Sequence, residues 1–139
     1  MKNQKVYYKV VSKMCSTFAG YRYQQTYKLN TPVSGCNNRP IFIFDSIENA
    51  RNYRKSFQRI FKCTATKVRK PYTLVSNYIG SIDNYWEVVD KAKKAKKNIN
   101  KALTNYNDKL IRSWGYGAFH ETIKGTLFAD SVTLLEEVK

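Results

Sequence analysis

Alternating apolar and polar residues predict strands near both ends of the chain. β-branched and aromatic residues at 5–11 and the apolar run at 41–44 are typical of strands, and 20–29 is a possible further strand. The Asn-, Pro- and Gly-rich residues 30–40 predict a loop between them. At the other end of the chain, alternation within 125–138 predicts one or two closing strands.

Residues 59–68 predict a strand with one buried face. Phe61, Cys63 and Ala65 alternate there with Lys and Thr, and a period of two sets every second side chain on the same face. Pro71 ends this strand because proline cannot donate to a sheet ladder. We therefore expect Cys63 in the core.

A short helix is predicted between these two strands. Asp45 and Glu48 have the spacing of a capping box, with Asp in place of the usual Ser or Thr. Four apolar residues at helical steps follow and should form its buried stripe: Ile47, Ala50, Tyr53 and Phe57.

Residues 84–114 contain neither Gly nor Pro and predict a long helix. Ser81 or Asp83 can cap its start, and Gly115 supplies its end. Alternatively, the sequence NYND at 105–108 splits it into a helical hairpin. An apolar seam with steps of three and four runs along it: Val88, Ala92, Ala95, Ile99, Ala102, Tyr106 and Leu110.

Together these elements predict a single α+β domain over 1–139. It has a small, mostly antiparallel sheet, one short helix, and one long helix or helical hairpin that mediates oligomerisation. We expect a basic sheet region at 1–80, the long helix at 81–114 and closing strands at 115–139. One helix of that length cannot bury its whole seam against so small a domain, which favours a homo-oligomer formed through 84–114. The alternative is a helix that lies across the sheet.

Composition excludes several classes of protein. No run of 18 apolar residues is present, so we expect no membrane span, and the N-terminus has no apolar segment typical of a signal peptide. Three widely spaced cysteines favour reduced thiols, and hence the cytoplasm. With one His and no CxxC pair, we expect no metal site.

The net charge of +15 predicts an anionic partner. Residues 1–80 carry 15 Lys and Arg against only Asp45 and Glu48, whereas 81–139 carry 10 against 8. Phosphate-bearing ligands, either nucleotides or nucleic acid, are the natural candidates. The alternative is that the charge only keeps the protein soluble.

The sequence contains no glycine-rich phosphate motif and no nucleophile–base arrangement. His120 is the only histidine, and a lone His among aromatics is more often a packed or surface residue than a base. We therefore expect a protein that is not an enzyme, with no catalytic residue and no cofactor.

Basic residues interleaved with aromatics are the candidate ligand-binding set. Arginine gives planar paired donors to phosphate, and aromatic rings stack on bases. The candidates are Arg22, Tyr23, Arg51, Arg54, Arg112, Trp114 and His120.

Two stretches carry a family resemblance. IFIFDSIENARNYRKSF followed by IFKCTATKV, within 41–70, and GTLFADSVTLLEEV at 125–138 resemble small phage and prophage proteins. With the small size, the basic sheet and the long helix, the pattern is similar to the phage anti-Thoeris sponge family. That resemblance implies binding of a cyclic ADP-ribose isomer at a subunit interface without cleavage, and it assigns no site residue.

The resulting hypothesis is a non-enzymatic sponge that sequesters a phosphate-bearing cyclic nucleotide signal and so counters host defence. Three alternatives stay open: a basic nucleic-acid-binding protein, a protein-inhibiting or structural oligomer, and an enzyme that acts on nucleotides.

Overall fold

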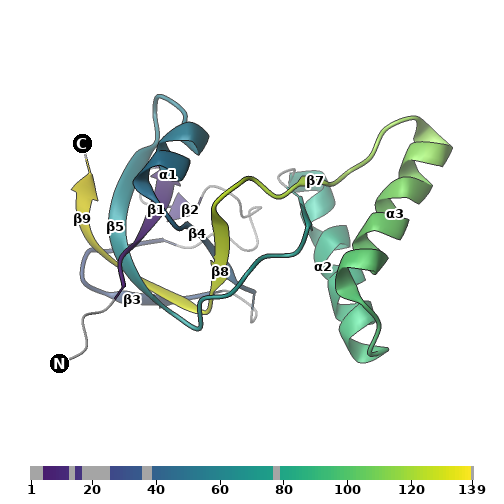
Figure 1. Ribbon diagram of the computed structural model, residues 1–139, viewed down its shortest axis with the longest axis horizontal. Helices are drawn as coiled ribbons and strands as arrows, with labels where there is room; N and C mark the ends of the chain where they lie inside the picture. The colour runs from purple at the N-terminus through teal and green to yellow at the C-terminus, as the bar shows by residue number, and fades with distance from the viewer. Residues whose placement is uncertain (1–4, 13–14, 17–25, 36–38, 77–78, 139) are drawn as a thin grey trace. The chain divides into compact units, whose positions relative to one another are not determined.

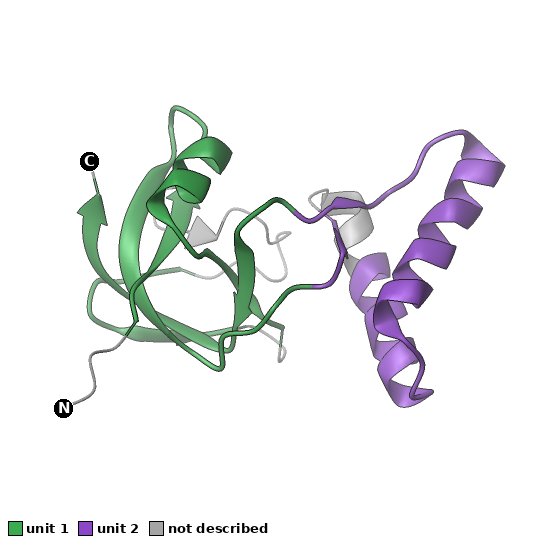
Figure 2. Ribbon diagram, viewed as in Figure 1, with its two compact units in different colours: residues 1–71, 123–139 green, residues 72–122 purple. Residues whose placement is uncertain are grey.

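The chain forms two compact units in the computed structural model, which describes residues 5–12, 15–16, 26–35, 39–76 and 79–138 (Figures 1 and 2). The barrel unit comprises residues 1–71 and 123–139, and the hairpin unit comprises residues 72–122. The closing strands therefore belong with the first half of the chain. The expectation of a single domain stays a prediction.

The barrel unit is built on an antiparallel sheet with the strand order β3-β9-β5-β1-β4-β8, and β2 pairs with β1. This confirms the predicted α+β class with a mostly antiparallel sheet. Its strands are β1 (Tyr7–Ser12), β2 (Cys15–Ser16), β3 (Pro32–Ser34), β4 (Ile41–Phe44), β5 (Arg59–Thr66), β8 (Thr126–Ala129) and β9 (Ser131–Val138).

The sheet closes on itself through the segment that follows β5. The chain turns at Lys67, whose φ is 50°. Arg69 then pairs with Phe128 of β8, and both backbone N–O distances are 2.9 Å. Strand β5 itself pairs with β9, and the segment that continues from β5 turns away to pair with β8. This segment covers the edge of β8 that β4 leaves unpaired. Closure removes an edge on which another strand could add.

The core lies on both faces of this curved sheet. Inside are Tyr7 and Val11 of β1 together with buried residues of β4, β5, β8 and β9. Cys63 is 0% exposed among them, which confirms its predicted place in the core. Helix α1 (Ile47–Tyr53) covers the other face, where Ala50 packs on residues of β1, β4 and β5.

Helix α1 begins one residue later than predicted. Ser46, not Asp45, is its N-cap, and the Ser46 hydroxyl accepts a hydrogen bond from the Asn49 N–H at 3.2 Å. Asp45 instead accepts from the Asn49 side-chain amide at 2.8 Å. The helix ends early because Arg54 has an extended backbone, so Phe57 lies outside it and is 67% exposed. The prediction that Phe57 belongs to the buried stripe was wrong.

The region before β4 was predicted only in part. Residues 20–25 of the possible strand at 20–29 lie outside the described residues. Within the predicted loop 30–40, the short strand β3 was missed. It forms because Val33 pairs with Val132 of β9, a long-range partner that its local sequence does not reveal.

The hairpin unit consists of α2 (Ile79–Lys94) and α3 (Ile99–Trp114) packed on each other, with β6 (Leu74–Val75) pairing with β7 (His120–Glu121). The prediction of one unbroken helix was wrong. The alternative hairpin is correct, but its turn lies at 95–98 rather than 105–108.

Local chemistry explains where the hairpin turns. Lys96 takes up a left-handed backbone with φ 56°, and the Lys97 N–H donates to the Ala92 carbonyl at 2.9 Å, which closes the end of α2. Asn98 then caps α3, because its side chain accepts from the Lys101 N–H at 2.9 Å. The predicted stop at Gly115 is confirmed, with φ 82°.

The seam that suggested an oligomer is divided between two helices rather than carried by one long helix. Within one copy, Ala92 is the only buried residue of the predicted seam, at 4% exposed, and Ala95 is exposed. A homo-oligomer through residues 84–114 therefore stays a prediction. In the described part of the chain, no helix has the length and apolarity needed to cross a membrane.

Candidate functional site

The predicted ligand-binding residues fall into three groups. Arg22 and Tyr23 lie outside the described residues. Arg51 and Arg54 lie at the end of α1 in the barrel unit, and both are exposed. The remaining three belong to the hairpin unit: Arg112, Trp114 and His120.

Helix geometry separates Arg112 from Trp114. Residues two apart on a helix do not face each other, so the two side chains leave α3 on different sides. His120 lies on the exposed strand β7, where it pairs with Val75. Helix geometry therefore does not bring the arginine and the aromatic ring of this pair together on one side of α3.

Several cations of the barrel unit are engaged by carboxylates across the sheet. Because they are partly neutralised, these positions are weak candidates for anion binding. The ion pairs are Arg59–Glu137 at 2.6 Å, Lys62–Glu136 at 3.2 Å and Arg69–Asp130 at 2.9 Å.

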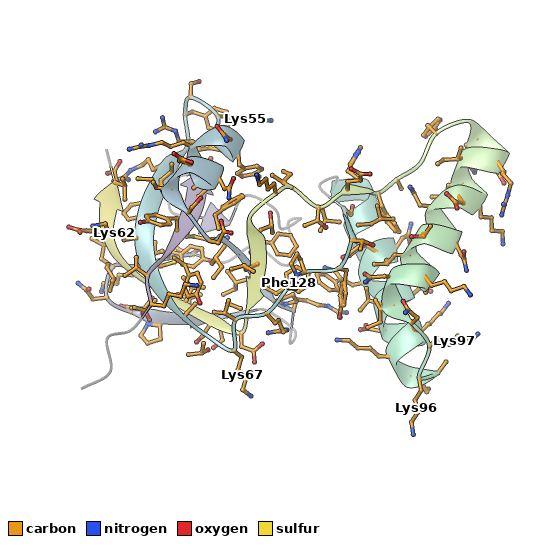
Figure 3. All side chains as sticks on the ribbon, viewed as in Figure 1. Lys55, Lys62, Lys67, Lys96, Lys97 and Phe128 are labelled. Carbon is orange, nitrogen blue, oxygen red and sulfur yellow. The ribbon has the colours of Figure 1, made fainter. Side chains whose placement is uncertain are left out.

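Among the residues that the structure describes, the turn of the helical hairpin carries the densest group of cations outside such pairs. We call the following five residues the lysine turn: Lys93, Lys94, Lys96, Lys97 and Lys101. All five are exposed, and none forms an ion pair with an acidic residue of the described ranges. No Asp or Glu occurs between residues 91 and 107. Figure 3 shows Lys96 and Lys97 at the turn itself.

A groove of about 500 Å³ lies along the hairpin between α2 and α3. Small residues form its apolar part, Tyr106 adds an aromatic ring, and Lys97 contributes a cation from the lysine turn. Lys91 also lines it, but its ammonium pairs with the Glu87 carboxylate at 2.9 Å. The full lining is Asn84, Glu87, Val88, Lys91, Ala92, Ala95, Lys97, Ala102 and Tyr106.

A second hollow, of about 270 Å³, lies at the end of α3. Trp114 and Tyr116 border it and are 69% and 71% exposed, which is unusual for rings of this size. Leu110, Gly117 and Ala118 complete its lining. We call this feature the aromatic hollow.

Asn107 fixes the loop beside the aromatic hollow. Its Oδ1 accepts the N–H groups of Ala118 and Phe119 at 2.9 and 3.0 Å. A Cβ at Gly117 would come within 2.4 Å of the same oxygen, so glycine is needed for this close approach. Phe119 is thereby anchored in an aromatic cluster with Tyr85 and Tyr106.

One buried ionisable side chain, that of Lys9, was missed by the sequence analysis. Lys9 is 2% exposed inside the barrel, where its Nζ donates to the Phe42 carbonyl at 2.7 Å and lies 5.7 Å from the centroid of the Tyr27 ring. Burial lowers the pKa of Lys9 to about 8, although the charge of nearby Cys63 acts in the opposite direction. Burial also raises the pKa of Cys63 to about 12.

The signal for this buried lysine is present in the sequence. Lys9 shares the parity of Tyr7 and Val11 in a strand, so it must point to the same face as these two core residues.

No protein-family model, no curated protein sequence and no solved structure matches this chain. The resemblance to the anti-Thoeris sponge family therefore stays a prediction. Within the ranges that the structure describes, no three His, Cys, Asp or Glu side chains gather where they could hold a metal ion.

Proposed function

We propose that this chain is a non-enzymatic nucleic-acid-binding protein whose lysine turn contacts the phosphate backbone. The observation that supports this proposal is that five exposed lysines gather at the turn between the two helices of the hairpin. None of them has an acidic partner among the described residues. This was one of the alternatives that the sequence left open.

Two physical properties of lysine favour binding to a phosphate backbone. Ammonium groups on flexible stems bind phosphates as point charges and can follow a backbone whose geometry varies. Neutralising several phosphates releases the counterions condensed on the nucleic acid, which drives association. The backbone N–H groups of Lys96 and Lys97 donate to the Lys93 and Ala92 carbonyls at 3.1 and 2.9 Å, so the turn presents these cations together.

The proposal is tested by neutralising the lysine turn. Replacing all five lysines by glutamine should weaken binding of a labelled oligonucleotide at least 100-fold at 0.1 M salt, because up to five phosphate contacts are lost. Fluorescence anisotropy measures the dissociation constants of the two proteins.

A matched control removes the same charge from the other unit. Five exposed lysines of the barrel unit are replaced by glutamine: Lys5, Lys28, Lys55, Lys70 and Lys124. We expect this control to lose far less affinity than the lysine-turn variant. Equal losses in the two variants would show that net charge alone is responsible and would contradict a site at the turn.

The groove of the hairpin favours a second candidate function, the sequestration of a cyclic nucleotide. Its volume of about 500 Å³ lies within the roughly 300–1,000 Å³ of small-molecule sites. Tyr106 offers a ring for an adenine and Lys97 a cation for a phosphate. Glu87 in the same lining opposes an anion, so this candidate ranks second.

Thermal melting with cyclic nucleotides and cyclic ADP-ribose isomers tests the second candidate. A ligand at 100 times its dissociation constant adds about 2.7 kcal/mol to the unfolding free energy. The Ala95→Trp variant, which fills the groove, should abolish that shift, whereas Thr104→Trp on the exposed surface of α3 should keep it. A ligand recovered intact after heat denaturation separates a sponge from an enzyme.

A further inference from the structure

We propose that the aromatic hollow at the end of α3 stacks an unpaired base, so that the nucleic acid bound by this protein is single-stranded. This inference rests on the proposed function, because the lysine turn supplies the phosphate contacts and the hollow adds the recognition of bases.

The exposure of Trp114 and Tyr116 is the first observation. They are 69% and 71% exposed although the neighbouring Phe119 is 4% exposed in the aromatic cluster of the unit. Aromatic rings left in water beside a filled core are available as a stacking platform. Every base has a π-face, so such a platform binds bases with little regard to sequence.

The size of the hollow is the second observation. Its volume of about 270 Å³ is below the roughly 300–1,000 Å³ of pockets that enclose drug-sized ligands. It therefore fits one ring system rather than a whole dinucleotide. Leu110 and Ala118 add apolar lining beside the two rings.

A base can enter the hollow only if it is unpaired. In a duplex the π-faces of the bases are covered by their neighbours, and only base edges are accessible in the grooves. Extruding a base from a duplex costs a few kcal/mol, whereas a single strand presents its bases freely. The hollow therefore selects single strands over duplexes, while the lysine turn accepts both.

The lysine turn and the hollow lie at opposite ends of the same helix. Helix α3 has 16 residues and is about 24 Å long, which spans about seven phosphates at the duplex rise of about 3.4 Å per strand. An extended single strand has more widely spaced phosphates and places fewer of them over this length. Thr104, Ile111 and Trp114 follow one another at steps of seven and three, so they share one side of α3. Exposed Lys101 and Asp108 lie three and four residues from Thr104 and border that side, so a strand that passes along it from the turn to the hollow runs beside one cation and one carboxylate.

A protein partner fits these observations less well. Among residues 72–76 and 84–122, the part of the hairpin unit whose burial is described, three large apolar residues are exposed: Ile111, Trp114 and Tyr116. A stable protein interface uses about 20–30 residues on each side, and an excess of lysine disfavours such an interface. A strand with a negative backbone and flat bases matches both the charge and the rings.

The test compares a labelled single strand of twelve thymidines with a duplex of twelve base pairs. Trp114→Ala should weaken binding of the single strand about tenfold, the loss expected for one stacked base, and should leave duplex binding unchanged. The slope of affinity against salt concentration should not change, because no charge is removed. Phe57→Ala, which removes an equally exposed aromatic ring of the barrel unit, is the control and should bind like the wild type.

A second readout does not depend on affinity. The chain has two tryptophans, and Trp86 is 4% exposed, so a quencher in solution reports mainly on Trp114. Thymidine strands should quench this emission in the wild type, and the quenching should disappear in Trp114→Phe.

The outcomes separate the two proposals. If the lysine-turn variant loses binding but Trp114→Ala and Trp114→Phe bind and respond like the wild type, the stacking inference is wrong and the proposed function stands. If wild-type protein binds neither oligonucleotide, both proposals fail. Equal losses for single strand and duplex in Trp114→Ala would also overturn the inference, as would a change in oligomeric state without loss of binding.

Discussion

Lys9 shows at the scale of one residue how the barrel tolerates a buried charge. Its ammonium is satisfied by the Phe42 carbonyl and lies near the Tyr27 ring, yet burial still lowers its pKa to about 8. A shifted pKa means that stability depends on pH, because the folded and unfolded states bind different numbers of protons.

The sign of this dependence follows from the direction of the shift. Between pH 8 and the ordinary lysine value of 10.5, the unfolded state binds more protons, so stability rises with pH. Cys63 acts the opposite way from pH 9 to 12, because its pKa is raised from 9.0 to about 12. Lys9 therefore dominates between pH 8 and 9, where we expect a gain of about 1 kcal/mol.

Urea unfolding at pH 7, 8 and 9 measures this gain. Lys9→Met should abolish the rise between pH 8 and 9, because the titrating group is gone. Lys5→Met, which removes an exposed lysine close by, should retain it. A rise that persists in Lys9→Met would show that another group is responsible.

Asn107 carries a second prediction at this scale. Asn107→Ala should lower the unfolding free energy by about 2 kcal/mol, because two backbone N–H groups lose their acceptor. Asn105→Ala, on the same helix but exposed, should cost less than about 0.5 kcal/mol. Similar values for the two variants in chemical denaturation would contradict the role given to Asn107.

At the scale of elements, the hairpin turn shows why some boundaries escape sequence reasoning. No Gly or Pro marks residues 95–98, and a left-handed Lys96 is not expected from its residue type. The apolar spacing of the sequence continues through the turn, although the buried residues include Val89 and Leu103, which lie outside that seam, and Ala95 of the seam is exposed. The one local signal is Asn98, a good cap, whereas the Asn residues at 105–108 lie inside α3.

The cap at Asn98 can be tested directly. Asn98→Ala should cost about 1 kcal/mol, because the Lys101 N–H loses its acceptor and the end of α3 is exposed. Circular dichroism during thermal unfolding reports the change, with Asn105→Ala again as the control. If Asn98→Ala were as stable as Asn105→Ala, the cap would not hold the turn.

The elements of the barrel unit were easier to predict than its closure. Strands β1, β4, β5, β8 and β9 follow from alternation or apolar runs, since their partners bury one or both faces. Closure depends on the pairing of Arg69 with Phe128, and no local pattern encodes a contact between residues so far apart in the chain. Strands β6 and β7 have two residues each, too few to show a period.

At the scale of the whole molecule, the distribution of charge changes when residues are grouped by unit. The barrel unit carries 17 Lys and Arg against 5 Asp and Glu, and the hairpin unit 8 against 5. The sequence therefore points to the first half of the chain as the electropositive part. The turn nevertheless brings five lysines of the less charged unit together, and none of them forms an ion pair with an acidic residue of the described ranges.

The candidate site could be predicted from the sequence only as a list of residue types. Arg112 and Trp114 are adjacent in the sequence pattern but diverge on α3, whereas Trp114 and Tyr116 border one hollow because Gly115 ends the helix between them. In the sequence the five lysines fall within the segment predicted as one long helix, and the turn at 95–98 gathers them.

The central claim is that the lysine turn neutralises phosphates, and the salt dependence of binding tests it most directly. The affinity for a single-stranded oligonucleotide is measured from 50 to 300 mM salt for the wild type and for the variant with all five lysines replaced by glutamine. Five contacts contribute about −3.5 to the slope of log affinity against log salt, so the variant should have a slope shallower by up to that amount. Equal slopes in the two proteins would contradict the account and place the phosphate contacts elsewhere on the molecule.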